Sequence, residues 1–168
     1  MESCVENGGK SSPGRVRPFE SFELGETHRS PVRTVEQDEV RRFADLTGDR
    51  NPIHLDPVFA RQTVFRGTIA HGLLLASILA GMAYDRGLLG KNILALESSS
   101  ERYLAPVRPG DRVYGTVRIA EVDGSASKRC GRVVWDLKLH RVVADQPDET
   151  VVEATWSTLV FRDRYLKA

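Results

Sequence analysis

The chain has 168 residues, of which 40% are hydrophobic and 28% charged, and its formal net charge is +1. This length fits one domain with a substantial core, and the nearly balanced charge gives no reason to expect binding to nucleic acid or to an anionic membrane. The two cysteines, Cys4 and Cys130, lie far apart and indicate neither a disulfide framework nor a metal-ligand cluster. We therefore expect a reduced, cytoplasmic setting.

Residues 1–17 are rich in glycine, serine, proline and charge. They are predicted to form a disordered leader before a single domain over residues 18–168. The first residues lack a basic start followed by an apolar run, so no signal peptide is expected. The longest apolar run, 73–83, is far shorter than the roughly 20 residues that a membrane-spanning helix needs.

A helical pattern begins at Thr34, where Thr34 and Gln37 fit a capping box, and Gly48 suits the end of this helix. Asp56–Pro57 then predicts the start of a short helix, because Asp is a favoured N-cap and Pro a favoured first residue. The run His71–Tyr84 is apolar nearly all round, which indicates a helix enclosed on most sides.

After Gly90 the hydrophobic period changes to two, and four strands are predicted, over 93–104, 112–122, 129–143 and 150–162. Consecutive strands with short connections favour an antiparallel sheet. The fold class is therefore α+β, with the sheet wrapped around the enclosed helix. A helix this apolar needs more cover than one small sheet provides, so we expect a second subunit.

A possible acid/base pair lies on the loop after the first helix. Asp49 and His54 are five residues apart, and Pro52 between them fixes its own φ and stiffens the loop. Gly72, at the start of the enclosed helix, offers a free backbone N–H with no side chain in the way. A carboxylate, an imidazole and an amide of this kind fit the addition of water to an activated double bond.

Three sequence blocks, 43–56, 65–72 and 103–111, resemble the MaoC-like dehydratases, a family that includes the (R)-specific enoyl-CoA hydratases. The resemblance implies a hotdog fold, in which an antiparallel sheet wraps a long central helix. It also implies a homodimer or a dimer of dimers with active sites at the subunit interface. The implied substrate is an acyl thioester, with coenzyme A or the phosphopantetheine of an acyl carrier as part of it and no separate cofactor.

The resemblance places the family's catalytic carboxylate on Asp49, its catalytic imidazole on His54 and its carbonyl-binding amide on Gly72. Asn51 and His71 also match and are expected to support the site. In the reaction we expect Asp49 to deprotonate the water and His54 to supply the proton of the α-carbon, each positioned transfer contributing about 100- to 10,000-fold. The predicted activity is that of a trans-2-enoyl or (R)-3-hydroxyacyl thioester hydro-lyase.

Other interpretations of the same residues stay open. Asp49 alone is also typical of a turn, His54 of a packed or solvated loop position, and His71 of a helix cap. Asp49, His54 and His71 lack the close spacings of zinc sites, so no metal is expected. Two alternative functions are a hotdog thioesterase and a non-catalytic partner subunit. The absence of Asp and Glu from 73–84 argues against the thioesterase.

Overall fold

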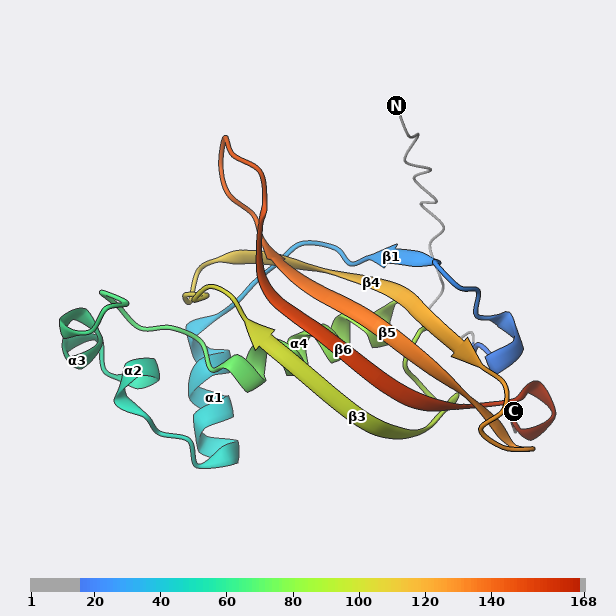
Figure 1. The fold of residues 1–168 in the computed structure, drawn as a ribbon. Coiled ribbons are helices and arrows are strands. Elements are labelled where there is room, and N and C mark those ends of the chain that lie inside the picture. The colour runs from blue at the N-terminus through green and yellow to red at the C-terminus, as the bar shows by residue number, and fades with distance from the viewer. Residues whose placement is uncertain (1–15, 167–168) are drawn as a thin grey trace.

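The computed structural model describes residues 16–166 of the chain. A six-stranded antiparallel sheet curves around one long helix, α4 (Gly72–Asp85), and three further helices project from one end (Figure 1). The predicted α+β class and the hotdog arrangement are therefore confirmed. Of the leader predicted for residues 1–17, residues 1–15 lie outside the described residues, and Arg17 forms an ion pair with Glu26 at 2.6 Å.

All four predicted strands are present, and two short strands from the N-terminal part join them. Their order in the sheet is β1-β4-β5-β6-β3, with β2 also paired to β4. The strands are β1 (Thr27–Arg29), β2 (Arg33–Thr34), β3 (Ile93–Tyr103), β4 (Arg112–Asp123), β5 (Cys130–Arg141) and β6 (Glu149–Phe161). The turn after β3 thus joins two strands that are consecutive in sequence but not neighbours, since β3 pairs with β6.

The core lies between α4 and the concave face of the sheet. Alternate apolar residues of β4, β5 and β6 are buried there, and Trp135 of β5 is 1% exposed. The helix packs close to β4 because Gly115 has no side chain: a Cβ there would lie 3.0 Å from Leu79 Cδ2 and from Met82 Sδ. Glycine at this position sets the distance between helix and sheet.

The projecting helices are α1 (Gln37–Thr47), α2 (Pro52–Leu55) and α3 (Pro57–Gln62), and single turns of 3₁₀ helix occupy Phe19–Ser21 and Asp163–Tyr165. The capping box expected at Thr34 and Gln37 was wrong, because Thr34 belongs to β2, and Glu36 and Glu39 form the box instead. The predicted helix end is confirmed: Gly48 has φ 78°, in the left-handed region.

The sheet covers only one face of α4. On the other face Leu73 is 65% and Tyr84 64% exposed, which leaves apolar surface in water. Within residues 16–166, no helix combines the length and the hydropathy that crossing a bilayer requires.

Candidate active site

The loop between α1 and α2 is held by its own polar groups. The Asp49 carboxylate accepts a hydrogen bond from the backbone N–H of Asn51 at 3.3 Å. The Asn51 side chain accepts one from the Ile53 amide at 3.1 Å, so Asn51 caps α2 and Pro52 is the first residue of that helix. This capping fixes the direction of α2, and with it the position of His54.

His54 is 9% exposed, and its Nδ1 lies 2.8 Å from the carbonyl oxygen of Ile69. A carbonyl oxygen only accepts, so Nδ1 carries the proton and Nε2 of the neutral ring has a free lone pair. Burial lowers the pKa of His54 and His71 lowers it further, against the hydrogen bond to Ile69 and the charge of Asp49. The neutral ring, able to accept a proton at Nε2, therefore predominates at neutral pH.

His71 connects the loop to the start of α4. It is 2% exposed, its Nε2 donates to the backbone oxygen of Asp49 at 3.0 Å, and its ring stacks on that of His54 with centroids 3.8 Å apart. The Phe43 ring also contacts it, at 5.1 Å between centroids. Nδ1 of His71 is buried without a hydrogen-bond partner among residues 16–166. These contacts hold the Asp49 backbone and the His54 ring relative to each other.

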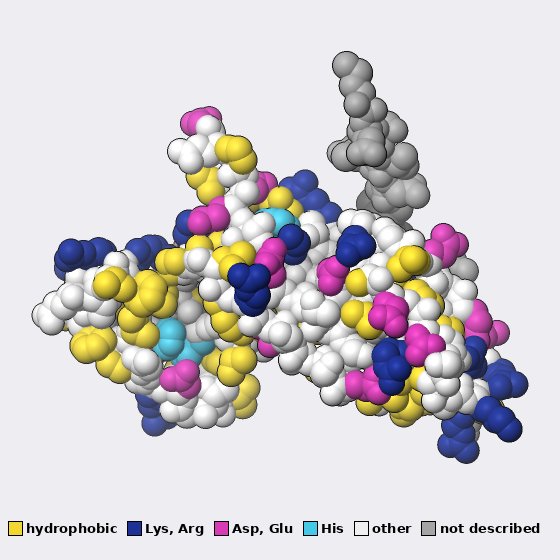
Figure 2. Space-filling view, in the orientation of Figure 1, with side chains coloured by type: hydrophobic (Ala, Val, Ile, Leu, Met, Phe, Trp, Pro, Cys, Tyr) yellow, Lys and Arg dark blue, Asp and Glu magenta, His cyan; other side chains and the backbone are white. Residues whose placement is uncertain are grey.

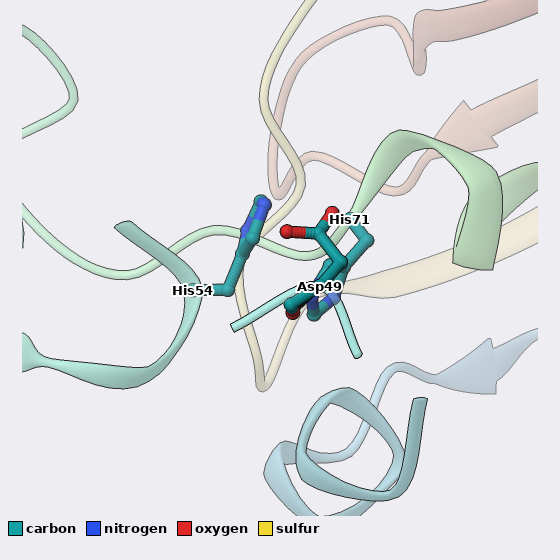
Figure 3. Close-up of side chains that lie close together, drawn as sticks. All are labelled: Asp49, His54 and His71. Atoms are coloured by element: carbon teal, nitrogen blue, oxygen red, sulfur yellow. Dashed lines mark hydrogen bonds between the residues drawn. The ribbon is translucent and has the colours of Figure 1, made fainter. Parts of the chain in front are cut away.

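The side chains of Asp49, His54 and His71 converge, and one oxygen or nitrogen of each lies within 4.8 Å of the others (Figure 3). Two hydrogen bonds of about 2.8 Å to one water span about 4.6 Å, so the spacing suits a water bridging Asp49 and His54. A metal ion fits less well. The two imidazole rings are stacked with their planes 30° apart, so their in-plane lone pairs do not meet at one point.

Gly72 begins α4, where the first N–H groups have no acceptor within the helix and the helix dipole is positive. A pocket of about 360 Å³ is lined by both His54 and Gly72. Its other walls include the side chains of Phe65, Leu75 and Tyr103. Figure 2 shows histidine side chains at the surface where the α1–α3 segment meets the sheet, with hydrophobic side chains around them.

The structure therefore brings Asp49, Asn51, His54, His71 and Gly72 together, and each lies where it can serve one site. Two groups were not anticipated from the sequence. The carbonyl oxygen of Ile69, which sets the His54 tautomer, belongs to an irregular segment with no side-chain signal. The alternation of β3 can place Tyr103 on one face of its strand, but it cannot place the ring opposite Gly72.

Comparison with known proteins gives a family match over most of the chain: residues 21–138 match the family model described as MaoC like domain. The 3-hydroxybutyryl-CoA dehydratase of Methylorubrum extorquens is 40% identical over 108 residues, covering 64% of this chain and 67% of that protein. The (R)-specific enoyl-CoA hydratase of Aeromonas caviae is 40% identical over 100 residues, covering 60% and 72%.

A solved structure from Archaeoglobus fulgidus, described as a monoamine oxidase regulatory protein, superposes with a TM-score of 0.78 at 31% identity. The superposition covers 88% of this chain and 95% of that one. The structural similarity therefore covers a larger share of the chain than the matched sequence segment does.

Proposed function

The chain belongs to the MaoC like domain family, and on that basis we propose that it is an enoyl thioester hydratase/dehydratase. Its reaction is the addition of water to a trans-2-enoyl thioester, or the reverse loss of water from an (R)-3-hydroxyacyl thioester. Two relatives with 40% identity are named as enzymes of this kind. The observation that carries the proposal is the convergence of Asp49 and His54, beside a pocket that His54 and Gly72 line.

In the hydration direction, one water bridges the Asp49 carboxylate and Nε2 of His54. The imidazole takes a proton from this water as the oxygen bonds to the β-carbon. The electron pair of the double bond then moves toward the carbonyl, and the resulting enolate oxygen is stabilised by the Gly72 N–H and the helix dipole. One group of this type contributes about 3–4 kcal/mol to the stability of a transition state.

The imidazolium of His54 then returns its proton to the α-carbon, and the thioester carbonyl re-forms. Hydroxyl and hydrogen are added to one face, because a single side chain both removes and delivers the proton. In this proposal His54 takes the proton of the water, a role that the sequence analysis gave to Asp49. The hydrogen bond from Nδ1 to Ile69 supports it, since it leaves Nε2 as an acceptor, and Asp49 then orients the water and stabilises the imidazolium.

The thioesterase alternative is less well supported. Within α4 the one carboxylate is Asp85, at the opposite end from Gly72. At 1.5 Å per residue the two ends of this helix are about 20 Å apart, too far for Asp85 to reach a thioester carbon held by Gly72. The non-catalytic alternative is disfavoured by the complete set of side chains at the site.

We also propose that the enzyme is a homodimer or a dimer of dimers. The exposed face of α4 and the edge of β3 form an apolar groove of about 880 Å³, whose lining includes Leu73 and Leu96, and Leu96 is 56% exposed. Exposed edge strands and apolar patches are common sites of association. Leu96→Lys is expected to give a monomer by light scattering, and an unchanged mass would contradict this interface.

The acyl carrier, whether coenzyme A or an acyl-carrier protein, is part of the substrate in this proposal, and no separate cofactor is needed. The test is loss of the enoyl thioester absorbance with the crotonyl thioester of each carrier. His54→Ala should lower kcat/KM by about 100- to 10,000-fold, the range for a positioned proton transfer, and Asp49→Asn should also lower it strongly, because the water and the imidazolium lose their charged partner. Circular dichroism should show that both variants are folded.

Two matched substitutions control for loss of charge or imidazole in general. Asp38→Asn removes an exposed carboxylate of α1, which pairs with Arg42, and His28→Ala removes a histidine of β1, which contacts Glu26. Both should retain wild-type rates. Rates close to wild type in Asp49→Asn or His54→Ala would remove the proposed mechanism.

A further inference from the structure

Tyr103 is the last residue of β3, and its side chain faces α4. In the β3–β6 ladder it pairs with Val152, which is 0% exposed and belongs to the inward row of β6. The next residue, Leu104, continues this anchoring through its amide, which donates to the Val151 oxygen at 2.9 Å. The backbone of Tyr103 is thus fixed by the sheet, and the ring extends from a rigid element.

The ring lies directly against the start of α4. A Cβ placed on Gly72 would be 3.0 Å from Cε1 and Cζ of Tyr103 and 3.2 Å from Cδ1, closer than ordinary van der Waals contact. The ring also lines the same pocket as His54, and the residue is 46% exposed. Tyr103 therefore forms the wall at the pocket mouth, facing the Gly72 backbone.

We propose that Tyr103 is a specificity-determining residue, whose ring restricts the enzyme to thioesters without a substituent on the α-carbon. The inference rests on the proposed function, because it requires the thioester oxygen to accept from the Gly72 N–H. The α-carbon is then two bonds from that oxygen, beside the Gly72 backbone. A group on it that points into the space between Gly72 and the ring meets the ring carbons at about the 3.0 Å found for a Cβ on Gly72, so the ring must shift to admit it.

The experiment compares kcat/KM for crotonyl and 2-methylcrotonyl thioesters, which differ by one α-methyl group. The wild-type enzyme should favour the unbranched substrate, and Tyr103→Ala should reduce this preference by about 10- to 200-fold, the usual value of one methyl-sized contact. Tyr103→Phe, which keeps the ring and removes only the hydroxyl, should keep the wild-type ratio.

Two further variants make the result decisive. Tyr103→Leu retains part of the bulk and should give an intermediate ratio, which also covers the case in which the alanine variant is unstable. Tyr165→Ala removes another exposed tyrosine, in the C-terminal 3₁₀ turn at the other end of the sheet (Figure 1), and should leave the ratio unchanged.

Three results would overturn the proposal. The first is an equal kcat/KM of the wild-type enzyme for the two substrates. The second is a crotonyl to 2-methylcrotonyl ratio that stays at the wild-type value in both Tyr103→Ala and Tyr103→Leu. The third is a change of this ratio in Tyr103→Phe as large as in Tyr103→Ala, which would assign the effect to the hydroxyl. A wild-type protein that hydrates neither substrate with either carrier would instead contradict the proposed function itself.

Discussion

Replacement of Gly72 by valine tests the amide at the start of α4. The new Cβ would lie 3.0 Å from two ring carbons of Tyr103, and the two methyl groups of valine would occupy the space that the thioester carbonyl needs. Overpacking of this size typically costs about 1–3 kcal/mol of stability. We expect a cost within that range, because the backbone of Tyr103 is held in β3 and its ring faces Gly72.

The effect on catalysis should be larger than the effect on folding. Loss of one oxyanion donor removes about 3–4 kcal/mol of transition-state stabilisation, and at 1.36 kcal/mol per tenfold this predicts a decrease in kcat of about 100- to 1,000-fold. The assay is the decrease of enoyl thioester absorbance at saturating crotonyl thioester. A urea titration of the same preparation measures the change in unfolding free energy.

Gly81→Ala provides the matched control on the same helix. A Cβ at Gly81 meets no atom within 4 Å, and Gly to Ala inside a helix stabilises by about 0.5–1 kcal/mol, so this variant should be active and slightly more stable. Gel filtration should show that both variants associate as the wild type does. A Gly72→Val enzyme within a few-fold of the wild-type kcat would refute the assignment of the amide as the oxyanion donor.

Four further predictions concern pH and packing. Because burial lowers the pKa of His54, its neutral form should persist below pH 6.5. The value of kcat/KM should therefore be constant through neutral pH and fall at acidic pH with a midpoint below 6.5. A fall in kcat/KM with a midpoint above 6.5 would contradict this. As the pH falls, the unfolded chain binds a proton on His54 at a higher pH than the folded chain does. The unfolding free energy should therefore decrease as the pH falls from about 6.5 through the lower pKa of the folded state. In urea titrations at several pH values, His54→Ala should reduce this pH dependence. His71→Ala leaves the Asp49 carbonyl without its hydrogen-bond donor and removes the ring stacked on His54. The unfolding free energy should therefore fall by about 2–4 kcal/mol, and kcat should fall with it. Unchanged stability would show that the buried ring does not hold the loop. Gly115→Val places side-chain atoms against Leu79, which should lower the unfolding free energy by about 1–3 kcal/mol or more. A variant whose calorimetric Tm equals that of the wild type would rule out the close packing of α4 on β4.

Local chemistry made the element order and the site residues accessible from the sequence. Two-residue alternation predicted the strands, because successive side chains of a strand point to opposite faces, and the left-handed Gly48 ended α1 where expected. The short spacing from Asp49 to His54 predicted that both lie on one loop stiffened by Pro52, but Pro52 begins α2 and His54 belongs to that helix. The capping box failed because Thr34 pairs with Arg112 across the sheet, a contact with no local signal.

The long-range contacts were decided only by the tertiary structure. Pairing of β3 with β6 sets which side chains reach the pocket, and it brings Tyr103 to within contact of Gly72, 31 positions earlier in the chain. The Ile69 carbonyl accepts from Nδ1 of His54 and so decides which nitrogen of the neutral ring is free. Residue types and short spacings determine what chemistry is available, whereas the direction of a proton and the shape of a pocket depend on backbone groups that distant segments bring together.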